Sequence, residues 1–246
     1  MKALIFAAGL GTRLYPYTSN RPKALVPISG TPMLQHIILK LKKFGINEFY
    51  INVHHFSDQI IHFLQANNNF NCKINISNEK DELLDTGGGL KKVLDMLSEN
   101  ENILVHNVDI WTNYDLSLLI KQHIKSEALA TMLVQKRNTS RYLLFHPQEK
   151  QLKGWMNNKT NEKIPNNIIT DDYKAFAFNG IHIVNSKART NFPDNRAFPL
   201  IPVYLNLTKK YKIVAHEIQN SYWLDLGKPE QIIKAEKLLL GDKKEI

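Results

Sequence analysis

The sequence predicts a single α/β domain with a Rossmann-like, doubly wound mixed sheet. Three features support this: a near-continuous apolar segment at residues 2–7, a glycine-rich loop directly after it, and alternating strand-like and helix-like segments over the first half of the chain. A strand that is apolar throughout is typical of a parallel sheet covered on both faces. Strands that alternate with helices favour the crossover connections of such a sheet.

The first half carries the clearest periodic signals. A helix is expected from Pro32, because apolar side chains return every three or four positions, Pro32 suits a first turn, and Gly45 suits the residue after the last turn. The other segments expected here are strands at 48–53, 73–77 and 103–106, a helix at 58–64, and a helix at 87–97 opened by three glycines.

The second half is less regular. The expected segments are strands at 129–135, 142–146, 175–184, 212–216 and 221–224, helices at 200–209 and 229–240, and loops such as 157–167. Trp155 is expected in a loop, and Gly241 is expected to cap the last helix. No linker separates the halves, so we expect one domain, 1–246. The first half, about residues 1–112, would bind nucleotide and phosphate. The second half, about residues 113–246, would complete the sheet and bind the sugar.

Composition excludes several classes of protein. With 43% hydrophobic and 22% charged residues, the 246-residue chain is neither disordered, collagenous nor a coiled coil. No apolar run approaches the ~20 residues of a membrane span, and the apolar run at the N-terminus is too short for a signal peptide. The single cysteine, Cys72, excludes an internal disulfide and a cysteine-rich zinc site. We therefore expect a cytoplasmic protein without a membrane partner.

The formal net charge of +9 suggests an anionic partner. The 26 lysines and 6 arginines are spread along the chain, with no basic cluster. Proteins that read DNA sequence depend on arginine forks, which are scarce here. The charge therefore does not predict nucleic-acid binding, and phosphorylated small molecules are compatible with it.

The most informative stretch is residues 7–14, AAGLGTRL, which is followed by Arg21-Pro22-Lys23. It lies between the first strand and the first helix, where a doubly wound fold places its phosphate loop. The dinucleotide fingerprint fails because its third glycine would fall at Leu14, and a Walker loop fails because no Gly-Lys-Ser/Thr follows.

Two glycines and two cations in this stretch indicate a site for phosphate groups. Gly9 and Gly11 allow backbone N–H groups to approach an anion. Arg13 offers a bidentate fork and Lys23 a point charge, and both suit a polyphosphate. The residues expected to bind the nucleotide here are Ala8, Gly9, Gly11, Thr12, Arg13 and Lys23.

Two aspartates follow strands and can reach the carboxyl edge of the sheet. Asp109 comes after the fourth predicted strand, and Asp225 follows the strand before the last helix. Two carboxylates from distant parts of the sequence can share one Mg²⁺ on a triphosphate, since Mg²⁺ takes hard oxygen ligands and few protein bonds. Loop aspartates are also common as caps and turns, and the residues alone leave that alternative open.

With these motifs in order, the chain resembles the sugar-1-phosphate nucleotidyltransferases, or nucleotide-sugar pyrophosphorylases. Their signature is Gly-x-Gly-Thr-Arg, a spacer and Pro-Lys, and residues 85–89, 107–112 and 223–227 also have counterparts. The resemblance covers nearly the whole chain, without the β-helix domain of longer relatives. It is greatest to N-acetylmuramate-1-phosphate uridylyltransferases, and mannose-1-phosphate guanylyltransferases come second.

The resemblance implies roles for further residues. Arg13 and Lys23 would be catalytic, and Mg²⁺ would be the cofactor, bound by Asp109 and Asp225. The remaining residues implied are Glu79 and Gly88 beside the nucleoside, and Asn107, Asn179 and Arg141 beside the sugar. Simpler roles remain open: an exposed Glu79, a tight helix entry at the three glycines, and an Asn107 that only brackets a loop. The histidines at 54, 55 and 62 are expected to be structural.

Three departures from the family pattern concern specificity. Val108 stands where the family usually has glycine before the metal-binding aspartate, and a β-branched residue disfavours positive φ there. The uridylyltransferase motif Gly-Arg-Gly-Asp is replaced near residues 141–144, where the acidic residue is missing, and residues 78–84 form a segment one residue longer. The sugar and the base are therefore left open.

The predicted reaction transfers a nucleoside monophosphate from an NTP, with UTP expected, to a sugar 1-phosphate and releases pyrophosphate. Alternatives are an enzyme resembling mannose-1-phosphate guanylyltransferase or choline-phosphate cytidylyltransferase, and a degenerate module that binds nucleotide sugars without catalysis. The expected partners are small-molecule substrates, with neither nucleic acid nor membrane. The sequence does not predict an oligomeric state.

Overall fold

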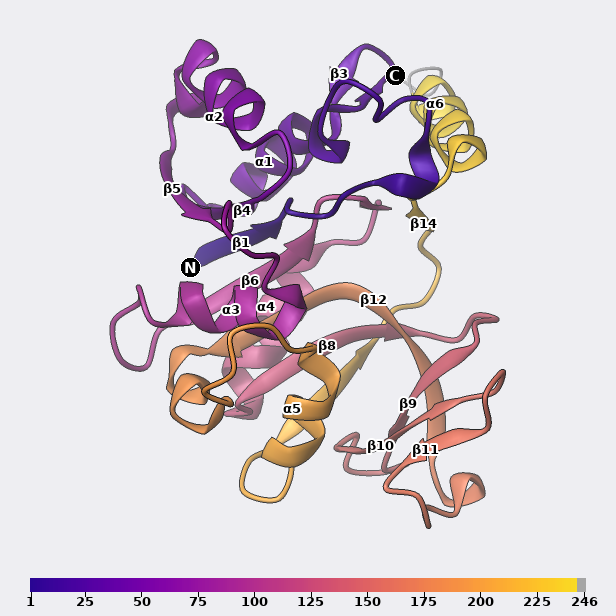
Figure 1. Ribbon diagram of the computed structural model, residues 1–246. Helices are drawn as coiled ribbons and strands as arrows, with labels where there is room; N and C mark the ends of the chain where they lie inside the picture. Colours follow the sequence, from indigo (N-terminus) through magenta and orange to yellow (C-terminus); the bar gives the residue numbers. More distant parts are fainter. Residues whose placement is uncertain (243–246) are drawn as a thin grey trace. The chain divides into compact units, whose positions relative to one another are not determined.

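The computed structural model describes residues 1–242, with side chains described up to Leu239, and it divides into two compact units (Figure 1). The first unit comprises residues 1–84, 106–113 and the chain from Tyr222 onward. The second comprises residues 85–105 and 114–221. Within residues 1–242, no helix combines the length and the apolar composition needed to cross a bilayer.

The first unit is built on a parallel sheet in the order β1-β4-β5. Its strands are β1 (Lys2–Phe6), β4 (Glu48–Val53) and β5 (Lys73–Asn78), and its helices α1 (Met33–Lys43) and α2 (Ser57–Ala66) follow β1 and β4. These elements confirm the predicted strands and helices to within two residues. After α1, Gly45 has a φ of 79°, as expected for the residue that ends a helix.

The first unit also holds two small antiparallel ribbons and the last helix. The elements are β2 (Pro27–Ile28) with β3 (Thr31–Pro32), β7 (Ile110–Thr112) with β14 (Trp223–Asp225), and α6 (Pro229–Asp242). The prediction that α6 ends at Gly241 is wrong, because the helix continues through this glycine. Strand β7 was not predicted, since three residues are too few for a periodic signal.

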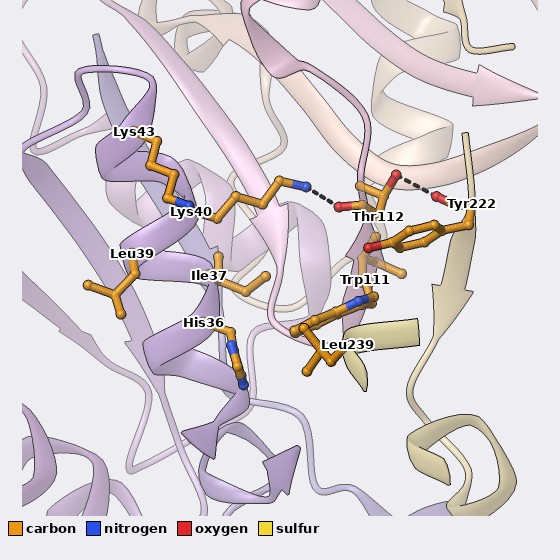
Figure 2. A pocket seen from close by; sticks show the side chains of 10 residues that line it. His36, Ile37, Leu39, Lys40, Lys43, Trp111, Thr112, Tyr222 and Leu239 are labelled. Atoms are coloured by element: carbon orange, nitrogen blue, oxygen red, sulfur yellow. Dashed lines mark hydrogen bonds between the residues drawn. The ribbon is translucent and has the colours of Figure 1, made fainter. Parts of the chain in front are cut away.

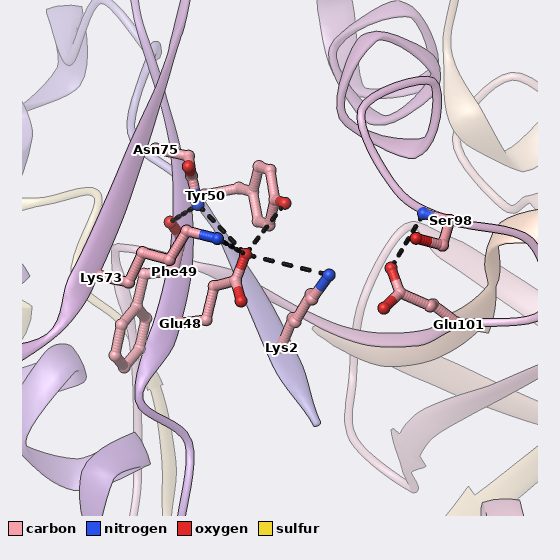
Figure 3. A network of polar contacts seen from close by, with 8 residues as sticks. All are labelled: Lys2, Glu48, Phe49, Tyr50, Lys73, Asn75, Ser98 and Glu101. Carbon is pink, nitrogen blue, oxygen red and sulfur yellow. Dashed lines mark hydrogen bonds and ion pairs between the residues drawn. The ribbon is translucent and has the colours of Figure 1, made fainter.

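A cluster of charged and polar side chains around Glu48 ties together the amino ends of the three parallel strands (Figure 3). Glu48 Oε1 lies 3.1 Å from Lys73 Nζ and 3.8 Å from Lys2 Nζ. It also accepts hydrogen bonds from Tyr50 Oη at 3.2 Å and Asn75 Nδ2 at 3.4 Å. The opposite, carboxyl ends of these strands lead into the glycine-rich loop and the segment at Glu79.

The second unit contains a mixed sheet with strands in the order β11-β10-β9-β12, in which β8 pairs with both β12 and β13. Its strands are β8 (Ala130–Gln135), β9 (Arg141–Phe145), β10 (Leu152–Asn157), β11 (Glu162–Ile164), β12 (Lys174–Asn185) and β13 (Ile213–Glu217). Its helices are α3 (Asp85–Leu94), α4 (Leu116–Ser126) and α5 (Leu200–Leu207). Strand β6 (Asn102–Asn107) begins in the second unit and ends in the first.

The loops expected around Trp155 and at residues 157–167 are wrong in part, and one helix was not predicted. Trp155 lies in β10 and pairs with Ile164 of β11, so residues 157–167 contain a strand and are not only a loop. Helix α4 was missed although its signals are present: Asp115 caps it by accepting from Ser117 N, and Leu116 and Leu119 lie on one buried face.

The core of the second unit contains a histidine without hydrogen-bond partners. His182, on β12, is 1% exposed, and neither of its ring nitrogens has a partner within the described residues. Its ring packs edge-on against Tyr204 at 5.5 Å between centroids. Burial, and after it the charge on His123, lower the pKa of His182 to about 3. The residue is therefore neutral in the folded protein over the physiological range.

We expect His182→Leu to stabilise the protein, because it removes buried polar atoms that make no hydrogen bond and fills the buried position with an apolar side chain. The pH dependence gives a stronger test. Between pH 6.5 and 3 the unfolded chain binds a proton at His182 and the folded chain does not, so wild-type stability falls as the pH falls. The free energy of unfolding of the variant relative to that of the wild type should therefore rise by about 2 kcal/mol between pH 7.5 and pH 5.

Urea unfolding at the two pH values measures this difference. His62→Leu is the control, because this side chain on α2 is exposed and keeps its hydration on folding. An advantage of His182→Leu that does not change with pH would contradict the assignment of a buried neutral histidine.

Candidate active site

The loop after β1 has the backbone that its glycines predict. Gly11 has a φ of 69° and precedes a 3₁₀ turn at Thr12–Leu14. A Cβ on Gly11 would lie 3.0 Å from Lys23 Cβ and 3.0 Å from Thr18 Cγ2, so a side chain here would be strained in conformation and tightly packed. A Cβ on Gly9 would meet no atom within 4 Å. The space beside Gly9 is therefore open to a ligand.

Two ion pairs join the predicted cations to the predicted carboxylates, all within the first unit. Lys23 Nζ forms an ion pair with Asp109 Oδ2, and the two side chains are only 12% and 14% exposed. Arg13 Nη2 lies 3.8 Å from Asp225 Oδ2, and these side chains are 60% and 40% exposed. The structure therefore brings together the four charged residues singled out in the sequence.

The pairing of β7 with β14 explains how two distant aspartates become neighbours. Asp109 lies in the turn between β6 and β7, and Asp225 is the last residue of β14. In the antiparallel register Asp225 is opposite Ile110, and Leu226 N donates to Asp109 O at 2.8 Å. The two carboxylates thus project from adjacent backbone segments.

Gly227 also belongs to this arrangement, although no individual role was predicted for it within its motif. Its N–H donates to Asp225 Oδ1 at 2.9 Å. A Cβ at this position would lie 2.5 Å from Arg13 Nη2 and 2.8 Å from Asp225 Oδ1. Glycine is therefore needed for the close approach of the arginine to the carboxylate.

The donor set fits Mg²⁺ bound largely by substrate oxygens. Within the described residues no group of three or more histidine, cysteine, aspartate or glutamate side chains forms a metal site. The protein thus offers the two hard carboxylates of Asp109 and Asp225, with cations already beside them. Mg²⁺ tolerates such a small set when phosphates and water complete its coordination, whereas a structural zinc site needs four protein ligands.

Glu79 is not the exposed residue that one interpretation of the sequence allowed. It follows β5 and is 3% exposed. Its Oε1 accepts from Asn52 Nδ2 at 2.9 Å, and its Oε2 accepts from Leu84 N at 3.1 Å. Asn52 Oδ1 in turn accepts from Ala7 N, the first residue after β1, at 2.7 Å. Asn52 was not predicted, although a polar residue among the apolar residues of β4 was an available signal.

Val108 is accommodated without backbone strain. It is 5% exposed, its N–H donates to Phe6 O at 3.1 Å, and it is not among the residues with positive φ. Asn107, predicted beside the sugar, is the last residue of β6 and is half-buried.

The other predicted residues lie on three separate elements of the second unit. Gly88 is buried in α3, and its N–H, like that of Gly87, points to Phe198 O, at 3.3 and 2.9 Å. A Cβ on Gly87 would lie 2.4 Å from the Phe198 ring, so the glycines also serve helix packing. Asn179 is fully buried in β12, and Arg141 is exposed at the start of β9.

A cavity of about 350 Å³ lies in the first unit behind β7 (Figure 2). Lys40 of α1 reaches across it to donate to Thr112 O, and Thr112 Oγ1 donates to Tyr222 O at 2.7 Å. Burial lowers the pKa of Lys40 to about 8. These contacts fasten the strand that follows Asp109 to α1 and to the segment leading into β14.

The chain is similar to known nucleotidyltransferases. A family model described as nucleotidyl transferase matches residues 2–241. The chain is 29% identical to the N-acetylmuramate alpha-1-phosphate uridylyltransferase of Caulobacter vibrioides, over 96% of each chain. It is 26% identical to the mannose-1-phosphate guanylyltransferase catalytic subunit beta of Xenopus tropicalis, over 95% of this chain and 63% of that protein.

Solved structures show the same fold. HddC from Yersinia pseudotuberculosis, complexed with GMP-PN, matches with a TM-score of 0.74 at 21% identity and covers 97% of this chain and 99% of its own. A UDP-glucose pyrophosphorylase complexed with UDP-glucose matches with a TM-score of 0.77 at 17% identity, over 98% of both chains. The predicted fold class and the resemblance stated above are confirmed.

Proposed function

Since the chain belongs to the nucleotidyl transferase family, we propose that it transfers a nucleoside monophosphate from an NTP, with UTP first, to a sugar 1-phosphate. The observation that carries this proposal is the pair of cation–carboxylate contacts beside the glycine-rich loop. The alignment over 96% of a uridylyltransferase supports UTP as the nucleotide and N-acetylmuramate 1-phosphate as the first acceptor to test.

The reaction needs little covalent chemistry from the protein. An oxygen of the sugar phosphate attacks the α-phosphorus in line, a new P–O bond forms, and the bond to the β-phosphate oxygen breaks to release pyrophosphate. A phosphate monoester dianion is already a competent nucleophile, so no general base is required. Catalysis is then positioning and neutralisation of charge.

The two cations have different tasks in this scheme. Arg13, exposed and forked, holds the departing β- and γ-phosphates. Lys23, which is largely buried, holds its ammonium between the α-phosphate and the incoming phosphate. Backbone N–H groups of the loop at Ala8–Thr12 complete the phosphate cradle, with the open space beside Gly9 admitting the ligand.

Asp109 and Asp225 would hold Mg²⁺, which when bound orients and neutralises phosphate oxygens. The residues we propose for binding the nucleoside are Gly88 and the segment that begins at Glu79. The sugar-binding residues we propose are Asn107, Asn179 and Arg141. Guanylyl transfer to mannose 1-phosphate is the second candidate, supported by the similarity to the Xenopus protein.

A pyrophosphate-release screen tests the proposal. All four NTPs are combined with a panel of sugar 1-phosphates and with choline phosphate, with Mg²⁺ and with chelator. We expect release for one NTP and sugar phosphate pair, dependent on Mg²⁺. Tight binding of a nucleotide sugar without release in any combination would instead support the degenerate binding module, and turnover of CTP with choline phosphate would support the cytidylyltransferase.

We expect Asp109→Asn and Asp225→Asn each to reduce Mg²⁺-dependent turnover at least tenfold while the protein stays folded. Each change removes a hard ligand from an ion that has few protein bonds. Turnover is measured against Mg²⁺ concentration, with Asp58→Asn on α2 as an exposed control in the same unit. Normal Mg²⁺ dependence in both active-site variants would sink the shared metal site.

We expect Val108→Gly to bring no gain in turnover and to lower stability by about 2–3 kcal/mol. The buried side chain is lost, and glycine has more backbone entropy to lose on folding. A pyrophosphate assay and a thermal melt of both proteins provide the measurement. A tenfold gain in turnover, equal to about 1.4 kcal/mol of barrier, would show that valine cripples the site.

A further inference from the structure

One peptide group at the end of β1 is held at both of its polar atoms. The carbonyl of Phe6 accepts from Val108 N at 3.1 Å, and the N–H of Ala7 donates to Asn52 Oδ1 at 2.7 Å. The first contact leads to the turn that carries Asp109, and the second leads to β4. Because the glycine-rich loop starts at this peptide group, its direction of departure depends on both contacts.

The N–H of Ala7 also fixes which way the Asn52 amide points. A backbone N–H can only donate, so the amide oxygen must face Ala7 and the NH₂ group must face the other side. There it donates to Glu79 Oε1 at 2.9 Å. Asn52 is 3% exposed, so water does not replace either partner.

Glu79 is fully engaged in holding this arrangement. Its second carboxylate oxygen accepts from Leu84 N, its N–H donates to Val53 O at 2.8 Å, and its carbonyl contacts His54 Nδ1 at 2.8 Å. Within the described residues its carboxylate has no lysine, arginine or histidine partner. The buried carboxylate therefore depends on the Asn52 amide and one backbone N–H.

We propose that Asn52 and Glu79 form a positioning pair that sets the start of the glycine-rich loop, and so the approach of its N–H groups to the NTP phosphates. The pair acts through Ala7 and does not touch the reacting atoms. This inference rests on the proposed function, because it assigns to the loop the phosphates of the NTP.

The hydrogen-bond directions allow a polarity reversal that tests the pair. Asn52→Asp alone places two carboxylates against each other, and Glu79→Gln alone cannot satisfy both Asn52 and Leu84. In the double variant Asn52→Asp/Glu79→Gln, the new aspartate accepts from Ala7 and from the glutamine NH₂, and the glutamine oxygen accepts from Leu84 N. All three hydrogen bonds return, and the net charge is that of the wild type.

We expect each single variant to lower kcat/KM for the NTP at least tenfold, chiefly through KM for the NTP, with KM for the sugar 1-phosphate little changed. The double variant should recover to within about threefold of the wild type. Melting temperatures and calorimetric titration with the Mg²⁺ complexes of UTP and GTP accompany the kinetics, so that a variant that folds poorly is recognised.

The matched control is the other asparagine–glutamate contact in the same sheet. Asn75→Asp/Glu48→Gln makes the same exchange at the amino ends of the strands, far from the loop, and should alter stability but not KM for the NTP.

A folded double variant at positions 52 and 79 that remains as impaired as the singles, or singles that use NTP normally, would overturn the positioning pair. A wild-type protein that binds NTP but releases no pyrophosphate overturns only the proposed reaction, and the titrations then decide the positioning pair. A wild-type protein that binds no NTP overturns both.

Discussion

The positions of the four charged residues at the candidate active site depend above all on the antiparallel pairing of β7 with β14. It places Asp225 opposite Ile110, and the hydrogen bond from Leu226 N to Asp109 O continues the pairing past the end of the ribbon. Two carboxylates so close together repel each other, which disfavours the folded state unless opposite charges lie nearby. Arg13 and Lys23 supply those charges from the loop after β1. The carboxylates of the β7–β14 ribbon and the cations that follow β1 therefore stabilise each other's positions, which explains why the four charged residues are neighbours.

The two ion pairs between the glycine-rich loop and the β7–β14 ribbon also fit the proposed phosphate chemistry. Each cation already lies beside a carboxylate, so in the proposed reaction a polyphosphate at the loop would replace one anionic partner of Arg13 or Lys23 by another. Asp109 and Asp225 would then hold the divalent cation. In the proposed reaction the metal would offset part of the negative charge of the nucleotide, so the two bound together would leave a smaller excess of charge than the nucleotide alone.

The elements of the first unit could be predicted because their apolar residues form runs long enough to show a period. The structure pairs Asp109 and Asp225 with the two predicted cations, whereas their role as metal ligands stays a prediction. Strands β7 and β11 have three residues each, too few to display alternation, and their existence depends on partners elsewhere in the chain. Asn52 stands out in the sequence as a polar residue inside a largely apolar strand, but its role, like that of Gly227, arises from what lies beside it in space, which a single sequence does not reveal.

The two ion pairs differ in burial, and this difference matches their proposed tasks. The Lys23–Asp109 pair is largely removed from solvent, where electrostatic interactions are stronger and a side chain has less freedom, so a group held there is already oriented when the reaction begins. The Arg13–Asp225 pair is longer and well exposed, and such pairs contribute little to stability and rearrange readily. An exposed arginine suits the leaving pyrophosphate, because a cation that held the product from a buried position would slow its release. The burial of each pair follows from the element that carries its cation: Lys23 begins a turn that packs against α1, whereas Arg13 lies in the 3₁₀ turn Thr12–Leu14, of which only Leu14 is buried.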